Sequence, residues 1–313
     1  MTLHRSLRYP ILAVAAAALS ACGTDREPGE LFGPEETGVL VVDAVLIVDQ
    51  PLPDLFLRRT QSPRQAYSLE TAAVIDARVV IAQGTRQYEY APDPDSAGRY
   101  VPLEAAAVVQ PVTRYELEVE AGGDFARAVT VTPGRLRIDG AHLLDEETLE
   151  VRRSLVLHDA EVDPFAVPEN QVRYLDGLLE LETNGIPAAG YQLALFSLDE
   201  TSDFVIDADF LEEDDYEDFE RQGASPPLAV ENGRARLPWF AVAFAGPHLF
   251  RLYALDQNWF DYVRTNPEDG FQPGGLVGDQ FERPQFSIEG GIGLFGSASV
   301  DSLCFNILPR LPE

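Results

Sequence analysis

The first residues with a recognisable chemistry surround Cys22. Arginines precede an apolar run over Ile11–Leu19, and small residues lead into the cysteine in Leu19-Ser20-Ala21-Cys22. A positive region, an apolar core and a small-residue cleavage site, in this order, are typical of a signal peptide. The cysteine makes the site a lipobox, in which the thiol is alkylated by a diacylglycerol before cleavage. We therefore predict a lipoprotein signal peptide over residues 1–21 and lipid attachment at Cys22.

This anchor would hold the chain at a membrane. The apolar run is shorter than the ~20 residues that a membrane-spanning helix needs. Each buried lipid methylene contributes ~0.8 kcal/mol, and two or three acyl chains, such as palmitate, bind far more firmly than one. The residue after the cysteine is Gly23, not the aspartate that retains many lipoproteins at the inner membrane. We therefore expect the outer membrane, on its periplasmic or cell-surface side.

A second candidate for chemistry is a run of carboxylates between residues 207 and 220. Calcium binds 6–8 oxygen ligands, but the spacing of an EF-hand is absent. A solvated acidic loop is the favoured interpretation, and a docking strip for a basic partner is the other alternative, because aromatic and leucine side chains are interleaved with the acids. The calcium candidates are Asp207, Asp209, Glu212, Glu213, Asp214 and Asp215.

Other motifs point to structure more than to chemistry. The run from Gly291 to Gly296 matches G-x-G-x-x-G, but the chain after it is too short for a βαβ unit, so we expect tight turns between packed strands and no dinucleotide. The aromatic pairs Trp239-Phe240 and Trp259-Phe260 are of the type that stacks on sugars, although core packing is favoured. The histidines His142, His158 and His248 lie far apart and form no metal or nucleophile motif, so no catalytic residue is predicted.

Composition limits the partners. The formal net charge is −29, which excludes nucleic acid as a natural partner, because phosphate backbones need compensating positive charge. Cysteines are few: if Cys22 carries lipid, Cys304 has no partner for a disulfide, and its apolar surroundings in the sequence predict a buried structural thiol.

The elements that would position these residues are mostly β-strands. Residues 22–37 are rich in Gly, Pro and acids and predict a flexible tether. Short alternating runs separated by Gly and Pro then predict an antiparallel β-sandwich over 38–134, with a boundary at Pro133-Gly134. Residues 135–313 predict a second β-rich domain with one short helix from Asp256 to Arg264, capped by Asp256 or Asn258.

Several motifs, in order along the chain, resemble a family of Bacteroidetes-type envelope lipoproteins of unknown function. The resemblance implies an immunoglobulin- or transthyretin-like N-terminal sandwich followed by a second β-rich domain. It implies no catalytic residues and no cofactor, and its genes often stand beside TonB-dependent receptors. The motifs are Val39-Leu40-Val41-Val42-Asp43-Ala44, Gly98-Arg99-Tyr100, Arg114-Tyr115-Glu116-Leu117-Glu118-Val119, Asp261-Tyr262-Val263 and Ile288-Glu289-Gly290-Gly291-Ile292-Gly293-Leu294-Phe295-Gly296.

Three hypotheses for function follow. The first is a non-catalytic binding or accessory module beside an outer-membrane TonB-dependent transporter. The second is a structural or adhesive envelope protein without a small ligand. The third is a hydrolase, which no local motif supports. A concave pocket with convergent polar groups would favour the third, and a flat apolar patch the first or second.

Overall fold

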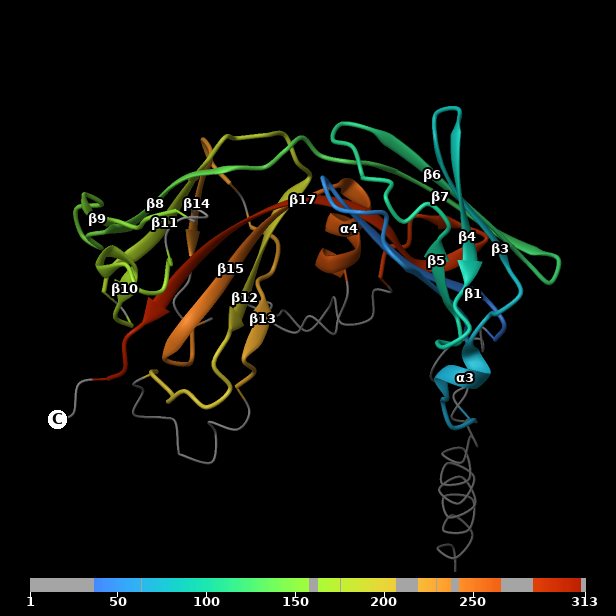
Figure 1. Ribbon diagram of the computed structural model, residues 1–313, viewed down its shortest axis with the longest axis horizontal. Coiled ribbons are helices and arrows are strands. Elements are labelled where there is room, and N and C mark those ends of the chain that lie inside the picture. Colours follow the sequence, from blue (N-terminus) through green and yellow to red (C-terminus); the bar gives the residue numbers. More distant parts are fainter. Residues whose placement is uncertain are drawn as a thin grey trace, which may run out of the picture.

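The computed structural model describes residues 37–62, 64–157, 163–174, 176–206, 219–228, 230–237, 242–265 and 284–310. In these residues the protein is mainly β, with a large mixed sheet, a second sheet and one helix of more than two turns (Figure 1). The predicted fold class, mainly β with a short helix, is confirmed; the likeness to immunoglobulin or transthyretin stays a prediction.

The N-terminal half of the molecule is built from one part of the larger sheet, in which the N-terminal strands pair with β16 and β17 from the end of the chain. Their order is β17-β1-β2-β5-β4-β3-β6-β7-β16, and β7 also contacts β17 and β1, so the sheet curls back on itself around a core. The strands are β1 (Leu40–Ile47), β2 (Leu55–Arg59), β3 (Arg78–Gln83), β4 (Arg86–Pro92), β5 (Arg99–Pro102), β6 (Arg114–Ala121), β7 (Asp124–Val131), β16 (Ile288–Glu289) and β17 (Gly291–Ile307).

Alternation in the sequence explains these strands. In β6 the residues Tyr115, Leu117 and Val119 are buried, while the glutamates between them are exposed. Because successive side chains of a strand point to opposite faces, this pattern puts one face on the core and one in water. The core so formed includes Tyr100, Tyr115 and Phe295. A four-residue helix, α3 (Leu69–Ala72), lies between β2 and β3.

The C-terminal half holds a second core between two sheets. The larger sheet continues from β17 through β15 (Gly246–Leu255) and β12 (Gly190–Ser197) to β13 (Gln222–Ala224), and β10 (Gln171–Val172) pairs with the end of β17. The smaller sheet has the order β14-β11-β8-β9. Its strands are β8 (Ile138–Leu144), β9 (Val151–Ser154), β11 (Leu178–Thr183) and β14 (Arg234–Leu237). A short 3-10 helix, η2 (Pro168–Asn170), precedes β10.

Strand β17 belongs to both halves. Residues 291–298 pair in parallel with β1, and residues 298–307 pair antiparallel with β15. In Figure 1 it runs as one long strand from the N-terminal half to the C-terminal half. Phe295 contributes to the first core, and Leu303, Phe305 and Ile307 contribute to the second. One strand therefore ties the two cores together, while the division into domains at residue 134 stays a prediction.

The helix α4 (Gln257–Thr265) forms where the sequence predicts it. Asp256 is its N-cap, because Asp256 Oδ1 accepts a hydrogen bond from the backbone N–H of Trp259 at 2.9 Å. Asn258 instead reaches across to β7 and β17, where its Nδ2 donates to the carbonyl oxygens of Val129 (2.7 Å) and Phe295 (2.9 Å). No helix among the described residues is long and apolar enough to cross a membrane.

One expectation for this region is wrong. The three glycines of the G-x-G-x-x-G run lie inside β17 and form no turns between strands. A Cβ at Gly291 would stand 2.8 Å from the carbonyl oxygen of Leu40, and one at Gly293 would stand 2.0 Å from that of Val42. These glycines therefore allow β17 to approach β1 closely. The described residues after them continue as strand through Ile307 and, up to residue 310, do not form the helix that a dinucleotide-binding unit would need there.

Candidate functional site

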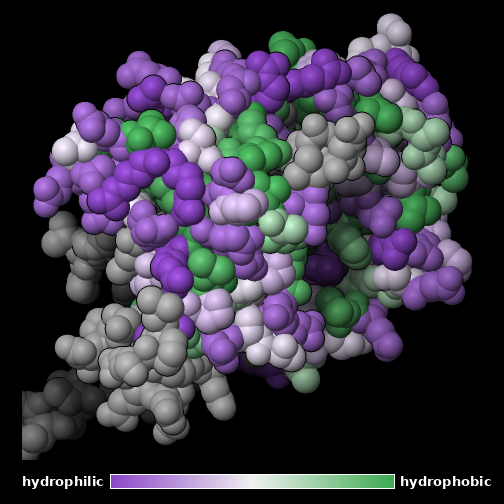
Figure 2. Space-filling model, turned by 60° about the vertical axis from the view of Figure 1, so that its left-hand side comes forward, coloured by the Kyte–Doolittle hydropathy of each residue, from purple (hydrophilic) through white to green (hydrophobic). Residues whose placement is uncertain are grey.

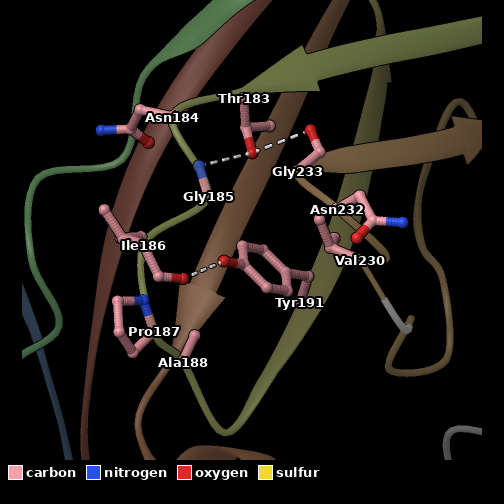
Figure 3. Close-up of a pocket in the computed structure, with 10 residues that line it drawn as sticks. All are labelled: Thr183, Asn184, Gly185, Ile186, Pro187, Ala188, Tyr191, Val230, Asn232 and Gly233. Carbon is pink, nitrogen blue, oxygen red and sulfur yellow. Dashed lines mark hydrogen bonds between the residues drawn. The ribbon is translucent and has the colours of Figure 1, made fainter.

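A shallow hollow lies at one end of the smaller sheet (Figure 3). Its volume is 520 Å³. Two segments between strands form it, namely the loop from β11 to β12 and the turn before β14. It is lined by Thr183, Asn184, Gly185, Ile186, Pro187, Ala188, Tyr191, Val230, Asn232 and Gly233.

Hydrogen bonds hold the two connections together. Thr183 Oγ1 donates to the carbonyl oxygen of Gly233 at 3.1 Å and accepts from the N–H of Gly185 at 3.2 Å. Gly185 (φ +61°) and Gly233 (φ +75°) adopt the left-handed backbone that favours glycine. The hollow is thus shaped mainly by backbone geometry, and a Cβ at Gly233 would lie 2.9 Å from the Thr183 carbonyl oxygen.

Tyr191 is the floor of the hollow. It is 6% exposed, and its hydroxyl donates to the carbonyl oxygen of Ile186, as Figure 3 shows. Burial raises the pKa of Tyr191 above its usual value, so the phenol stays neutral. None of the other nine lining residues has an ionisable side chain. The hollow therefore offers amide, hydroxyl and main-chain groups, which suits recognition better than acid–base chemistry.

The hollow also borders the connection between β7 and β8. The Asn184 side chain accepts from the N–H of Arg137 (3.1 Å) and donates to the carbonyl oxygen of Arg135 (2.8 Å). A Cβ at Gly134 would stand 3.5 Å from the Ile186 side chain. One wall of the hollow is thereby fixed to the segment that joins the two halves of the molecule.

A row of polar side chains crosses the smaller sheet beside this hollow. His142 stands opposite Ser154 on one side and opposite Glu180 on the other. His142 Nδ1 lies 2.9 Å from Ser154 Oγ, and His142 Nε2 lies 3.7 Å from Glu182 Oε2. Serine, histidine and carboxylate in this sequence of contacts have the residue types of a hydrolytic triad.

Gly140 and Glu180 shape that row. A Cβ at Gly140 would stand only 2.8 Å from His142 Nε2, so the glycine leaves the space that the imidazole occupies. Glu180 is 3% exposed and accepts from Arg236 Nε at 2.9 Å. Arg234 bridges both acids, with its guanidinium 2.7 Å from Glu182 and 3.6 Å from Glu180. The glutamates are therefore neutralised by arginines on β14.

A buried polar junction lies where α4, β7 and β17 meet. Thr130 donates to Asp256 Oδ2 at 2.5 Å and contacts Ser297 Oγ at 2.6 Å. Desolvation raises the pKa of Asp256, although hydrogen bonds from Thr130 and from backbone groups oppose that rise. Further along β17, Ser299 Oγ accepts from the N–H of Leu136 at 2.8 Å. Every one of these groups has a partner, so the junction is structural.

His248 is a second buried polar group. It is 1% exposed and stacks on Phe305, and its Nδ1 lies 2.9 Å from the carbonyl oxygen of Gly246. Burial lowers its pKa, and its Nε2 has no hydrogen-bond partner. Ser197 stands opposite it in the sheet, and its buried Oγ also lacks one. His248 is thus a neutral core histidine on β15 of the larger sheet, whereas His142 lies on β8 of the smaller sheet.

The residues singled out in the sequence are only partly placed. Cys22, the calcium candidates Asp207, Asp209, Glu212, Glu213, Asp214 and Asp215, the pair Trp239-Phe240, and His158 lie outside the described residues. Cys304 is a free, half-buried thiol whose pKa is raised by burial. Within the described residues no three His, Cys, Asp or Glu side chains are placed to hold a metal ion.

Trp259 and its neighbours are not an exposed sugar platform. Trp259 is half-buried and lies 5.7 Å from the Tyr253 ring, centre to centre, and a Cβ at Gly296 would stand 3.0 Å from the Trp259 Cβ. Phe260 covers Gly190, whose Cβ would meet its ring at 2.3 Å. These aromatic side chains pack α4 against β12 and β17, in agreement with the favoured expectation that they serve core packing.

Sequence reasoning missed the Ser154–His142–Glu182 group. The signal was present as alternation, because Gly140 and His142, Glu180 and Glu182, and Arg234 and Arg236 each occupy every second position of a strand. Alternation places each pair on one face, but only the pairing of β9, β8, β11 and β14 brings the pairs together.

The fold and the site define a class of mainly β protein in which one long strand joins two cores and a shallow, backbone-lined hollow borders the joint. The chain belongs to the family described as domain of unknown function DUF4249, whose model matches residues 27–303. The expected membership of an uncharacterised family is therefore confirmed. Comparison with curated proteins found no match.

Proposed function

We propose that the chain is a lipid-anchored protein of the outer membrane that works as a non-catalytic binding or accessory module beside a TonB-dependent transporter. The lipobox ending at Cys22 supports the anchor. The observation that carries the binding role is the hollow, since it presents main-chain, amide and hydroxyl groups on rigid turns. The association with a transporter rests on the resemblance of the ordered motifs.

The hollow is open and shallow, which matches a protein segment better than a fully enclosed small molecule. Exposed Pro187 stands on its rim, and Asn232 (φ +52°) holds the turn that faces it. Figure 2 shows one face of the molecule, which is mostly hydrophilic with hydrophobic residues in small groups. A purely structural or adhesive protein would not need this hollow.

The test is crosslinking on intact cells followed by purification of the tagged full chain. The wild type should recover an outer-membrane receptor, and Pro187→Trp, which fills the hollow, should reduce the recovery at least tenfold. Leu198→Trp, on an exposed loop after β12, is the matched control and should recover as much as the wild type. Absence of any transporter from the wild-type sample would reject the accessory role. Equal recovery with Pro187→Trp would reject the hollow as the binding site.

Hydrolysis is a second candidate, because His142 is hydrogen-bonded to Ser154 at 2.9 Å and has Glu182 3.7 Å from its other ring nitrogen. In such a reaction Ser154 Oγ would attack an ester carbonyl and pass its proton to His142 Nδ1. The alcohol would leave with that proton, and water would then release the acid from the acyl-serine. We rank this second because Glu182 is 39% exposed and stands 3.7 Å from the imidazole, which weakens its influence on the histidine.

A fluorophosphonate probe and p-nitrophenyl acetate distinguish the two candidates. A hydrolase should be labelled at Ser154, and Ser154→Ala should lose both label and turnover. Ser68→Ala changes an N-cap serine that makes no side-chain cap hydrogen bond, and it should retain both. Absence of turnover in the wild type removes this candidate and leaves the binding module.

A further inference from the structure

The described chain begins at one end of the N-terminal half, and several segments meet there. The N–H of Gly38 donates to the carbonyl oxygen of Thr60 at 2.8 Å. The carbonyl oxygen of Gly38 in turn accepts a hydrogen bond from Arg59 Nη1 at 2.5 Å. Arg59 Nη2 also donates to the carbonyl oxygen of Ala121, the last residue of β6 before the turn to β7. We call this region the tether end: it comprises the start of β1, the end of β2, residues 61–62 and 64–76 with α3, the start of β3, and the ends of β6, β7 and β16 around the β6–β7 turn. Figure 1 shows α3 at this extremity.

Large apolar side chains are exposed at the tether end. Tyr67 is 62% exposed, Leu69 is 57% exposed and Ile75 is 64% exposed, all on the segment between β2 and β3. Phe125, beside the β6–β7 turn, is 50% exposed, and the Arg127 guanidinium lies 5.4 Å from its ring centre. Tyrosine, leucine, isoleucine and arginine together are the composition of a surface that rests in the interface of a bilayer.

The charges at this end also differ from those of the whole chain. Five arginines stand here, Arg58, Arg59, Arg64, Arg78 and Arg127, and six acids, Glu70, Asp76, Glu118, Glu120, Asp124 and Glu289. Arg59 pairs with Asp124 at 2.8 Å, and Arg78 with Glu120 at 3.9 Å. These charges nearly cancel, so the end is close to neutral in a chain of net charge −29. An anionic lipid surface repels the acidic remainder and tolerates this end, which orients the molecule.

The chain outside the described residues has the length to bring this end to a membrane. If the predicted tether from Cys22 to Gly38 behaves as a random coil, it would span about 20–25 Å on average and at most about 55 Å. Tethering at this range gives an effective concentration on the order of millimolar, so a weak contact with lipid is populated.

Resting on the proposed lipid anchor, we propose that the tether end docks on the phospholipid surface, with Tyr67, Leu69, Ile75 and Phe125 inserted at the level of the headgroups. The occupant is the bilayer that holds Cys22. Insertion of these side chains would hold the body in one orientation instead of letting it move freely on its linker.

The test uses the lipidated full chain in vesicles of phosphatidylethanolamine and phosphatidylglycerol, with Cys304→Ser as background. A nitroxide is attached at Leu69→Cys, and at Leu198→Cys as the matched control, a residue of similar exposure on the C-terminal half. At residue 69 the ratio of oxygen to nickel-chelate accessibility should rise at least threefold on addition of vesicles. At residue 198 it should not change.

The outcomes separate the docking from the anchor. Flotation of the protein with the vesicles while residue 69 keeps its aqueous accessibility overturns the docking and retains the anchor. A protein that does not float overturns the anchor and the docking with it. Protection of residue 69 from both reagents, in place of preferential access by oxygen, means that a second copy covers this end, and it also overturns the docking. Ile75→Cys, at a second exposed position, should repeat the result of Leu69→Cys.

Discussion

Replacing Gly293 by alanine should strongly weaken the attachment of β17 to β1. Gly293 has φ +107°, and a Cβ there would stand 2.0 Å from the carbonyl oxygen of Val42 and 3.0 Å from its carbonyl carbon and nitrogen. The backbone conformation alone costs about 2 kcal/mol for a residue with a side chain. The overlap with the Val42 oxygen must then be relieved by moving the strands apart by about 1 Å, which weakens about two hydrogen bonds and costs a further ~2 kcal/mol.

The expected loss is therefore about 4 kcal/mol in the free energy of unfolding, or roughly 10 °C in Tm. Gly123→Ala is the matched control, because Gly123 has a similar φ of +95° but nothing lies within 4 Å of the added Cβ. It should lose about 2 kcal/mol through backbone strain only. Urea unfolding followed by near-ultraviolet circular dichroism measures both. Equal losses in the two variants would refute the reasoning that close approach to β1 is what requires glycine at 293.

Three further predictions concern buried polar groups. Because the pKa of His248 is lowered in the folded state, the folded state binds fewer protons than the unfolded state. The stability should therefore be fully present above the unfolded pKa of ~6.5 and be lost as the pH falls below it toward the lower pKa of the folded state. Urea titrations from pH 8 to 5 should show a slope that His248→Gln reduces. Because the pKa of Asp256 is raised in the folded state, this group stabilises the fold below pH ~4, and its contribution is lost as the pH rises. At pH 8 the free energy of unfolding of Asp256→Asn should therefore lie within ~1 kcal/mol of the wild-type value. Asp256→Ala removes the cap and the carboxylate that accepts from Thr130, and it should lose ~2–3 kcal/mol. Arg236→Gln should cost ~1–2 kcal/mol because Glu180 loses its 2.9 Å partner, and adding Glu180→Gln should restore most of this in a double-mutant cycle.

Local alternation predicted the strands whose two faces meet different surroundings. Apolar residues that alternate or run continuously between Gly and Pro breakers predict strands over 39–48, 114–120, 125–132 and 248–255. The strands β1, β6, β7 and β15 begin and end within two residues of these ranges. The helix α4 was expected because the chain changes from alternation to a capped polar–aromatic run at Asp256. β2, β4 and β8 were missed, since their short runs are interrupted by charged residues or glycine.

Long-range pairing was beyond sequence reasoning. The apolar pattern of the sequence predicts a final strand only over 299–308. β17 begins at Gly291 instead, because its parallel pairing with β1 stabilises a glycine-rich segment that has little strand propensity of its own. The same limit applies to the Ser154–His142–Glu182 group. Its members lie on three strands, and their contact depends on the register of β8 with β9 and β11.

The shared strand connects the hollow with the tether end. Along β17, Ser297, Ser299 and Asp301 face one way and hold β7 and the start of β8 by side-chain hydrogen bonds, with Asp301 Oδ2 accepting from the N–H of Ile138 at 2.7 Å. The wall of the hollow is bound to the same connection through Asn184. β17 also pairs with β1, whose first residues lie at the tether end. Within the described residues, continuous strands and hydrogen bonds therefore connect the hollow with the end that we propose to dock on lipid. Docking would then set the direction in which the hollow faces, and loosening β17, as Gly293→Ala does, should weaken partner recovery without changing a residue of the hollow.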